Sequence, residues 1–83
     1  MNKHDKLKEL REHVASLKLE ECELHEQILG ILTRMAKGKV YGDEHTDISQ
    51  KRSRINALRQ LASKKLQEIR HITKSLQQPL FNS

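Results

Sequence analysis

Apolar residues recur along residues 3–37 with the three-and-four spacing of a heptad repeat, and this spacing limits the folds open to the chain. The repeat consists of Leu7, Leu10, Val14, Leu17, Leu24, Ile28, Ile31 and Met35. Such spacing keeps one apolar stripe on one side of a helix for about four heptads. We therefore predict a long amphipathic helix over about residues 3–37, capped by Asn2 and stopped at Gly38.

A second heptad pattern predicts a second helix over about residues 47–77. Its members are Ile48, Ile55, Leu58, Ala62, Ile69, Ile72 and Leu76. Asp47, with Gln50 three residues later, has the pattern of a helix start. Pro79 ends the helix, because proline lacks the N–H that a helix interior needs.

The segment between the helices predicts a loop over about residues 38–46, with Gly42-Asp43 as its turn signal. Two apolar stripes joined by a short loop favour an antiparallel coiled-coil hairpin. We therefore expect an all-α fold, with residues 1–83 forming a single helical-hairpin domain and 79–83 a flexible tail. This size leaves little core, so association with further helices is expected.

One register matches nearly all the apolar residues of the two stripes. It pairs Leu10 with Leu76, Val14 with Ile72, Leu17 with Ile69, Leu24 with Ala62, Ile28 with Leu58 and Ile31 with Ile55. The same register centres the loop on Asp43 and places Glu21 opposite Lys65. We predict this pair as a structural polar layer, which sacrifices some stability for a unique register.

Several apolar residues lie outside the predicted stripes. They are Ala15, Leu19, Cys22, Leu29, Leu32, Leu61 and Leu66. Because burial of a leucine contributes roughly 1.5–3 kcal/mol, we expect these residues to form a partner or dimer face. The chain is then predicted to dimerise into a four-helix bundle, or to receive a helix from another protein.

The net charge of +5 is unevenly distributed, because residues 48–83 are strongly basic while residues 1–33 are mildly acidic. Possible phosphate contacts gather near the loop and early in the second helix: Arg34, Lys37, Lys39, Lys51, Arg52, Arg54 and Arg59. A basic helix attracts polyanions, so binding to nucleic acid is a second hypothesis. Against it, Asp43, Glu44 and Asp47 lie in the same region, and no aromatic residues are interleaved for base stacking.

Catalytic, cofactor and metal sites are not predicted. Cys22 and His25 are three residues apart, but no second Cys–His pair follows to complete a zinc site. A lone cysteine and the lack of a membrane-length apolar run favour a cytoplasmic protein. The sequence thus favours a non-enzymatic protein–protein interaction or assembly module, with a DNA- or RNA-binding accessory protein as the alternative.

Overall fold

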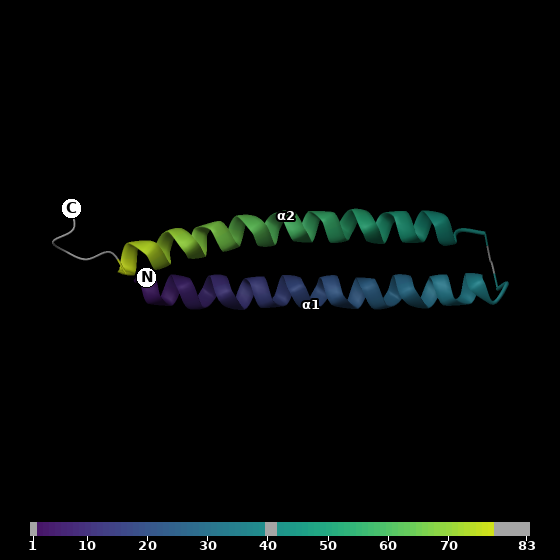
Figure 1. Cartoon of the computed structure of the whole chain (residues 1–83), viewed down its shortest axis with the longest axis horizontal. Helices are drawn as coiled ribbons and strands as arrows, with labels where there is room; N and C mark the ends of the chain where they lie inside the picture. Colours follow the sequence, from purple (N-terminus) through teal and green to yellow (C-terminus); the bar gives the residue numbers. More distant parts are fainter. Residues whose placement is uncertain (1, 40–41, 78–83) are drawn as a thin grey trace.

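Two antiparallel helices make up the fold. The computed structural model describes residues 2–39 and 42–77, which contain α1 (Lys3–Ala36) and α2 (Glu44–Gln77) and no strand. The helices lie side by side along their whole length (Figure 1). The predicted all-helical hairpin is therefore confirmed; the predicted tail at 79–83 lies outside the described residues.

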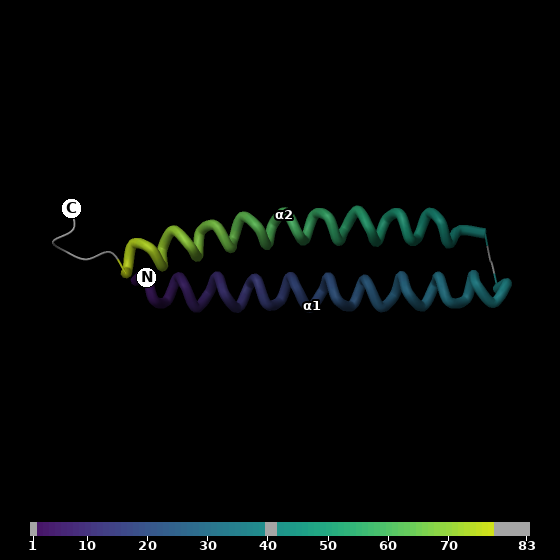
Figure 2. The backbone as a smooth tube through the Cα atoms, viewed as in Figure 1, coloured from purple at the N-terminus to yellow at the C-terminus, as the bar shows by residue number. Residues whose placement is uncertain are grey.

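The hairpin is a rod of 66 × 18 × 18 Å, with the start of α1 and the end of α2 at the same end (Figure 2). We call this end the open end and the other the tip. An elongated pair of helices has no interior beyond the seam between them. Residues on the remaining sides of each helix are therefore exposed unless another molecule covers them.

Both ends of α1 are capped as the sequence predicts. The Asn2 side chain accepts a hydrogen bond of 2.8 Å from the Asp5 N–H. At the other end Gly38 has φ of 79°, a left-handed conformation that costs glycine little. The Gly38 N–H donates to the Met35 carbonyl and the Lys39 N–H to the Arg34 carbonyl, both at 3.0 Å. These two bonds form a Schellman motif, which satisfies carbonyls that the helix end leaves free.

The start of α2 differs from the prediction, because the helix begins at Glu44 and not near Asp47. The Asp47 N–H donates to the Asp43 carbonyl at 3.0 Å, so Asp43 occupies the N-cap position. The Glu44 carboxylate accepts a 2.8 Å hydrogen bond from the Gly42 N–H, and this side chain is only 6% exposed. The predicted loop over 38–46 is therefore too long by about one helical turn.

The seam between the helices holds the core. The buried residues are Leu7, Leu10, Val14, Leu17, Ile28 and Ile31 of α1 and Ile48, Ile55, Leu58 and Ala62 of α2. Two clusters lie along it: one joins Ile28 and Ile31 to Ile48 and Ile55, and the other joins Leu17 to Leu58 and Ala62. Leu24 packs against both clusters and connects them.

The predicted register is wrong by one heptad. The sequence register placed Leu17 opposite Ile69, whereas Leu17 packs with Leu58 and Ala62. At the open end the Lys3 Nζ donates a hydrogen bond to Ser75 Oγ, which agrees with the same shift. A slip of seven residues moves one helix about 10 Å along the other. The early start of α2 explains this change of register. Because the turn is shorter, each seam residue of α1 lies opposite an α2 residue that is seven positions earlier in the sequence.

The predicted polar layer is also changed by this shift. Glu21 pairs with Arg59, at 3.2 Å between Oε1 and Nε, and not with Lys65. The Glu21 side chain is partly buried while Arg59 is exposed. Glu21 therefore interrupts the apolar stripe as predicted. Its partner, Arg59, comes from the edge of the seam and is exposed to solvent.

Candidate interaction surfaces

Two ion pairs flank the seam, one on each side. Arg54 contacts Glu20 at 2.7 Å, and Arg59 contacts Glu21 at 3.2 Å. Arg54 directly precedes the seam residue Ile55, whereas Arg59 directly follows Leu58, so their side chains leave α2 in opposite directions. We call the two sides of the hairpin the Arg54 face and the Arg59 face.

The pairing on the Arg54 face has two hydrogen bonds, from Arg54 Nε at 2.7 Å and from Nη2 at 3.3 Å, to the two oxygens of Glu20. This hydrogen bonding, and then the charge of Glu20, raises the pKa of Arg54 above its usual value. On the other face Arg59 Nη2 also lies 3.4 Å from His25 Nε2. Because all four ion-pair side chains are at least partly exposed, each pair aligns the helices more than it stabilises them.

The side of α1 that points away from α2 carries an apolar stripe. We call it the outer stripe; its members are Ala15, Leu19, Cys22, Leu29 and Ala36, and all are exposed. Leu19 is 62% exposed and Leu29 64%, the highest values among the exposed large apolar residues. Leu32, also exposed, lies between the outer stripe and the Arg59 face. The α1 residues of the predicted partner face therefore lie along one side of this helix, and Glu26 interrupts them between Cys22 and Leu29.

Leu61 and Leu66, the α2 residues of that predicted face, lie on opposite sides of the hairpin. Leu61 follows Arg54 by seven residues and shares the Arg54 face, whereas Leu66 follows Arg59 by seven and shares the Arg59 face. Leu61 is exposed and Leu66 half-buried. Only Leu66 is on the same side as Leu32, so the seven predicted residues do not form one face.

Charge is distributed unequally between the two faces. By helical position, the Arg59 face and its border with the outer stripe hold the cations Lys8, Arg11, Lys18, Arg52, Arg59 and Arg70, and one acid, Glu21. The Arg54 face mixes Lys6, Arg34, Lys37, Arg54 and Lys64 with Glu9, Glu20, Glu23, Asp47 and Glu68. The net positive charge of the chain is therefore concentrated on the Arg59 face.

A groove runs between the helices on the Arg59 face. Its lining residues are Lys18, Glu21, Arg59, Ala62, Ser63, Leu66 and Arg70. Ala62 and Leu66 provide an apolar floor, and cations stand on both helices beside it. The possible phosphate contacts predicted from the sequence did not include Lys18 or Arg70, and the position of Lys18 beside α2 depends on the register.

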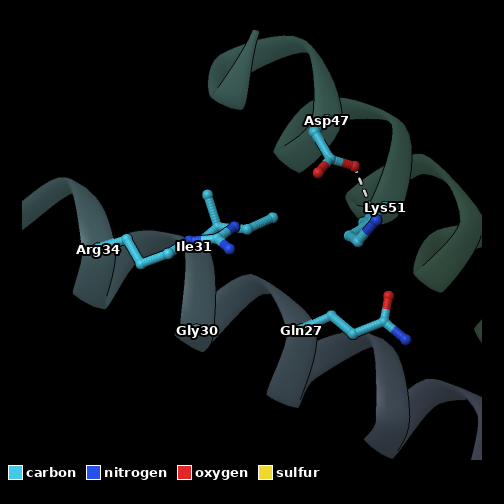
Figure 3. A pocket seen from close by; sticks show the side chains of 6 residues that line it. All are labelled: Gln27, Gly30, Ile31, Arg34, Asp47 and Lys51. Carbon is cyan, nitrogen blue, oxygen red and sulfur yellow. Dashed lines mark hydrogen bonds and ion pairs between the residues drawn. The ribbon is translucent and has the colours of Figure 1, made fainter. Parts of the chain in front are cut away.

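A second groove lies near the tip on the Arg54 face, lined by Gln27, Gly30, Ile31, Arg34, Asp47 and Lys51 (Figure 3). Lys51 Nζ contacts Asp47 Oδ1 at 2.7 Å, so its charge is balanced within the groove. Gly30 contributes no side chain, which leaves the middle of this groove open.

The residues predicted to contact phosphates do not form one surface. Lys51, Arg54 and Arg59 each pair with an acid of this chain. Arg34 and Arg54 lie on one face, Arg52 and Arg59 on the other, and Lys37 and Lys39 lie at the end of α1. The structure therefore brings together only part of the predicted set at any one place.

Within residues 2–39 and 42–77, no three side chains of His, Cys, Asp or Glu are grouped as metal ligands would be, and Cys22 is exposed within the outer stripe. Neither helix in this part of the chain is long and apolar enough to cross a membrane. Comparisons with known protein families, curated proteins and solved structures found no match.

Proposed function

We propose that this hairpin is a non-enzymatic protein–protein interaction module that associates with a second copy of itself through the outer stripe of α1. The observation that carries the proposal is the exposure of Leu19 and Leu29, at 62% and 64%, on the side of α1 that α2 does not reach. Burial of a leucine contributes roughly 1.5–3 kcal/mol, and the stripe offers several apolar neighbours to share it.

The charges favour this surface over the others for self-association. Packing two Arg59 faces together would bring Lys18 and Arg70 against the same cations of the second copy. The outer stripe instead has Arg11 and Lys18 along one border and Glu9 and Glu23 along the other. Two copies joined there form a four-helix assembly in which the two α1 helices are central.

An antiparallel arrangement of the two α1 helices fits the stripe better than a parallel one. In a parallel pair Glu26, which interrupts the stripe between Cys22 and Leu29, would face the same glutamate of the second copy. An antiparallel pair can place Leu19 opposite the second copy's Leu29, and Glu26 then lies beside Cys22. Like charges held in contact are unfavourable, so we expect the antiparallel form.

Sedimentation velocity at tens of micromolar tests the proposal. We expect a dimer for the native chain and a monomer for the double variant Leu19→Glu, Leu29→Glu. The matched control, Ser53→Glu with Gln60→Glu, adds the same charge to exposed positions on the outer side of α2 and should remain a dimer. A monomeric native chain, or equal dissociation of the two variants, would refute the proposal.

Cys22 reports the direction of the two helices. A parallel dimer places the two Cys22 side chains opposite each other, close enough for a disulfide under mild oxidation. In the antiparallel dimer they are offset along the axis by about one helical turn, so the disulfide should form slowly. Rapid, complete cross-linking of the native dimer would show that the antiparallel arrangement is wrong.

Nucleic-acid binding is the second candidate function, and the concentration of cations on the Arg59 face is the observation that favours it. Binding would use phosphate contacts and depend little on sequence. A short DNA duplex titrated at several salt concentrations should then show affinity that falls steeply with salt. Absence of binding at low salt would eliminate this candidate.

A further inference from the structure

The groove on the Arg59 face combines two properties that a single ligand must satisfy. Its floor is apolar, formed by Ala62 and the half-buried Leu66. Its borders are cationic on both helices, with Lys18 on α1 and Arg59 and Arg70 on α2. Glu21 already pairs with Arg59. Within residues 2–39 and 42–77, neither Lys18 nor Arg70 forms an ion pair.

We propose that this groove binds an acidic amphipathic helix of another protein, which packs against α1 and α2 as a third helix. A groove between two packed helices accepts the side-chain ridge of a further helix, and apolar residues at three- and four-residue spacing would cover Ala62 and Leu66. Glutamates on both sides of that ridge would meet Lys18 across one border and Arg70 across the other.

The apolar floor distinguishes this ligand from a nucleic acid. A sugar–phosphate backbone could contact Lys18, Arg59 and Arg70, but it would leave Leu66 against polar groups and gain nothing from burying it. An amphipathic helix buries the floor and pairs with the borders at the same time. The two kinds of contact occur together only in a ligand whose acids flank apolar residues.

A second copy of this chain does not fit the groove through the equivalent face, because cations would meet cations. The groove also lies on a different side of α1 from Leu19 of the outer stripe. The inference therefore goes beyond the proposed function: each copy in a dimer joined through the outer stripe retains its own groove. Binding to the groove and self-association can be disrupted separately.

The probe is a synthetic peptide of three heptads, with leucine at the a and d positions and glutamate at e and g. A matched control peptide has lysine in place of every glutamate. Fluorescence anisotropy with the full chain should show binding of the acidic peptide, weakening as salt is raised, and no binding of the basic peptide. Binding of both peptides alike, or of neither, would overturn the proposal.

Two double variants locate the binding. Lys18→Glu with Arg70→Glu reverses two cations of the groove, and we expect about a tenfold loss of affinity for the acidic peptide. Lys6→Glu with Lys64→Glu makes the same charge change on the Arg54 face and should alter affinity by less than about threefold. Equal losses would show attraction to net charge alone and refute a defined groove. Circular dichroism confirms that both variants remain helical.

Two further measurements separate this proposal from the others. Leu19→Glu with Leu29→Glu should abolish the dimer while preserving peptide binding; a loss of peptide binding would move the site to the outer stripe and overturn the groove. Leu66→Gln should weaken binding of the acidic peptide but not binding of a short DNA duplex. If the duplex binds more tightly than the peptide and also depends on Lys18 and Arg70, the face is a nucleic-acid surface and the helix proposal is wrong.

Discussion

Replacement of Leu58 by alanine is the most direct test of the seam. Leu58 is 2% exposed and packs in the cluster with Leu17 and Ala62. The substitution removes three carbon atoms, which at about 0.8 kcal/mol per buried CH₂ accounts for about 2.4 kcal/mol, and the cavity that remains adds to this loss. Because the rod is only 18 Å thick, neighbouring side chains can partly fill the cavity. We therefore expect a total loss of about 3 kcal/mol.

That loss is large for a chain of 83 residues, whose unfolding free energy is expected to be about 4–12 kcal/mol. It corresponds to a fall in the midpoint of thermal unfolding of about 12–24 °C. Urea unfolding followed by circular dichroism measures the free energy, and several protein concentrations are needed because association adds to apparent stability.

Leu76→Ala provides the matched control for this measurement. Leu76 lies near the end of α2 and is 37% exposed, so its truncation should cost less than about 1 kcal/mol. The heptad register read from the sequence instead pairs Leu76 with Leu10 in the core, which predicts comparable losses at the two positions. Equal losses for the Leu58 and Leu76 variants would refute the seam described above.

The remaining predictions concern the glycines and the polar layer. Gly30→Ala should raise the unfolding free energy by about 0.5–1 kcal/mol, because Gly30 is helical with open space at its Cβ position. Gly38→Ala should lower the unfolding free energy by about 1 kcal/mol, because φ at this position is 79°. Thermal unfolding of both variants shows whether each substitution stabilises or destabilises the chain. A change of the same sign at both positions would contradict the left-handed cap at Gly38. A double-mutant cycle of Glu21→Ala and Arg59→Ala should give a coupling of about 0.2–1 kcal/mol, whereas Glu21→Ala and Lys65→Ala should be additive. A larger coupling to Lys65 than to Arg59 would restore the register predicted from the sequence.

The two helices and the caps of α1 could be predicted because the signals are local. The heptad spacing of α1, the Asn2 cap and the left-handed Gly38 depend on residues within a few positions of one another. Each of these was predicted from the side-chain chemistry of one short segment, and the structure confirms each of them.

The register could not be predicted in the same way, because a heptad repeat matches itself after a slip of seven residues. Only the length of the turn distinguishes the two alignments. Asp43 and Asp47 are both good N-cap residues, and the choice of Asp47 lengthened the predicted turn, so that the turn agreed with the wrong register. The feature that favours Asp43 is Glu44, whose carboxylate reaches back to the Gly42 N–H.

The division of the predicted partner face was, in contrast, readable from the sequence. Leu61 precedes a seam position, Ala62, while Leu66 follows one, Lys65, and residues before and after the seam lie on opposite sides of a helix. The groove bordered by Lys18 and Arg70 was not readable, because it requires the correct alignment of the two helices.

The placement of both helix ends at one end of the rod has a mechanical consequence (Figure 1). A force that pulls Lys3 and Gln77 apart loads one layer of the seam at a time and opens the hairpin like a zipper. On α2, Ile69 and Ile72 at the open end are half-buried, whereas Ile48 and Ile55 nearer the tip are buried in a cluster with Ile28 and Ile31 of α1. Opening should therefore begin at low force, and the isoleucine cluster beside the turn should separate last.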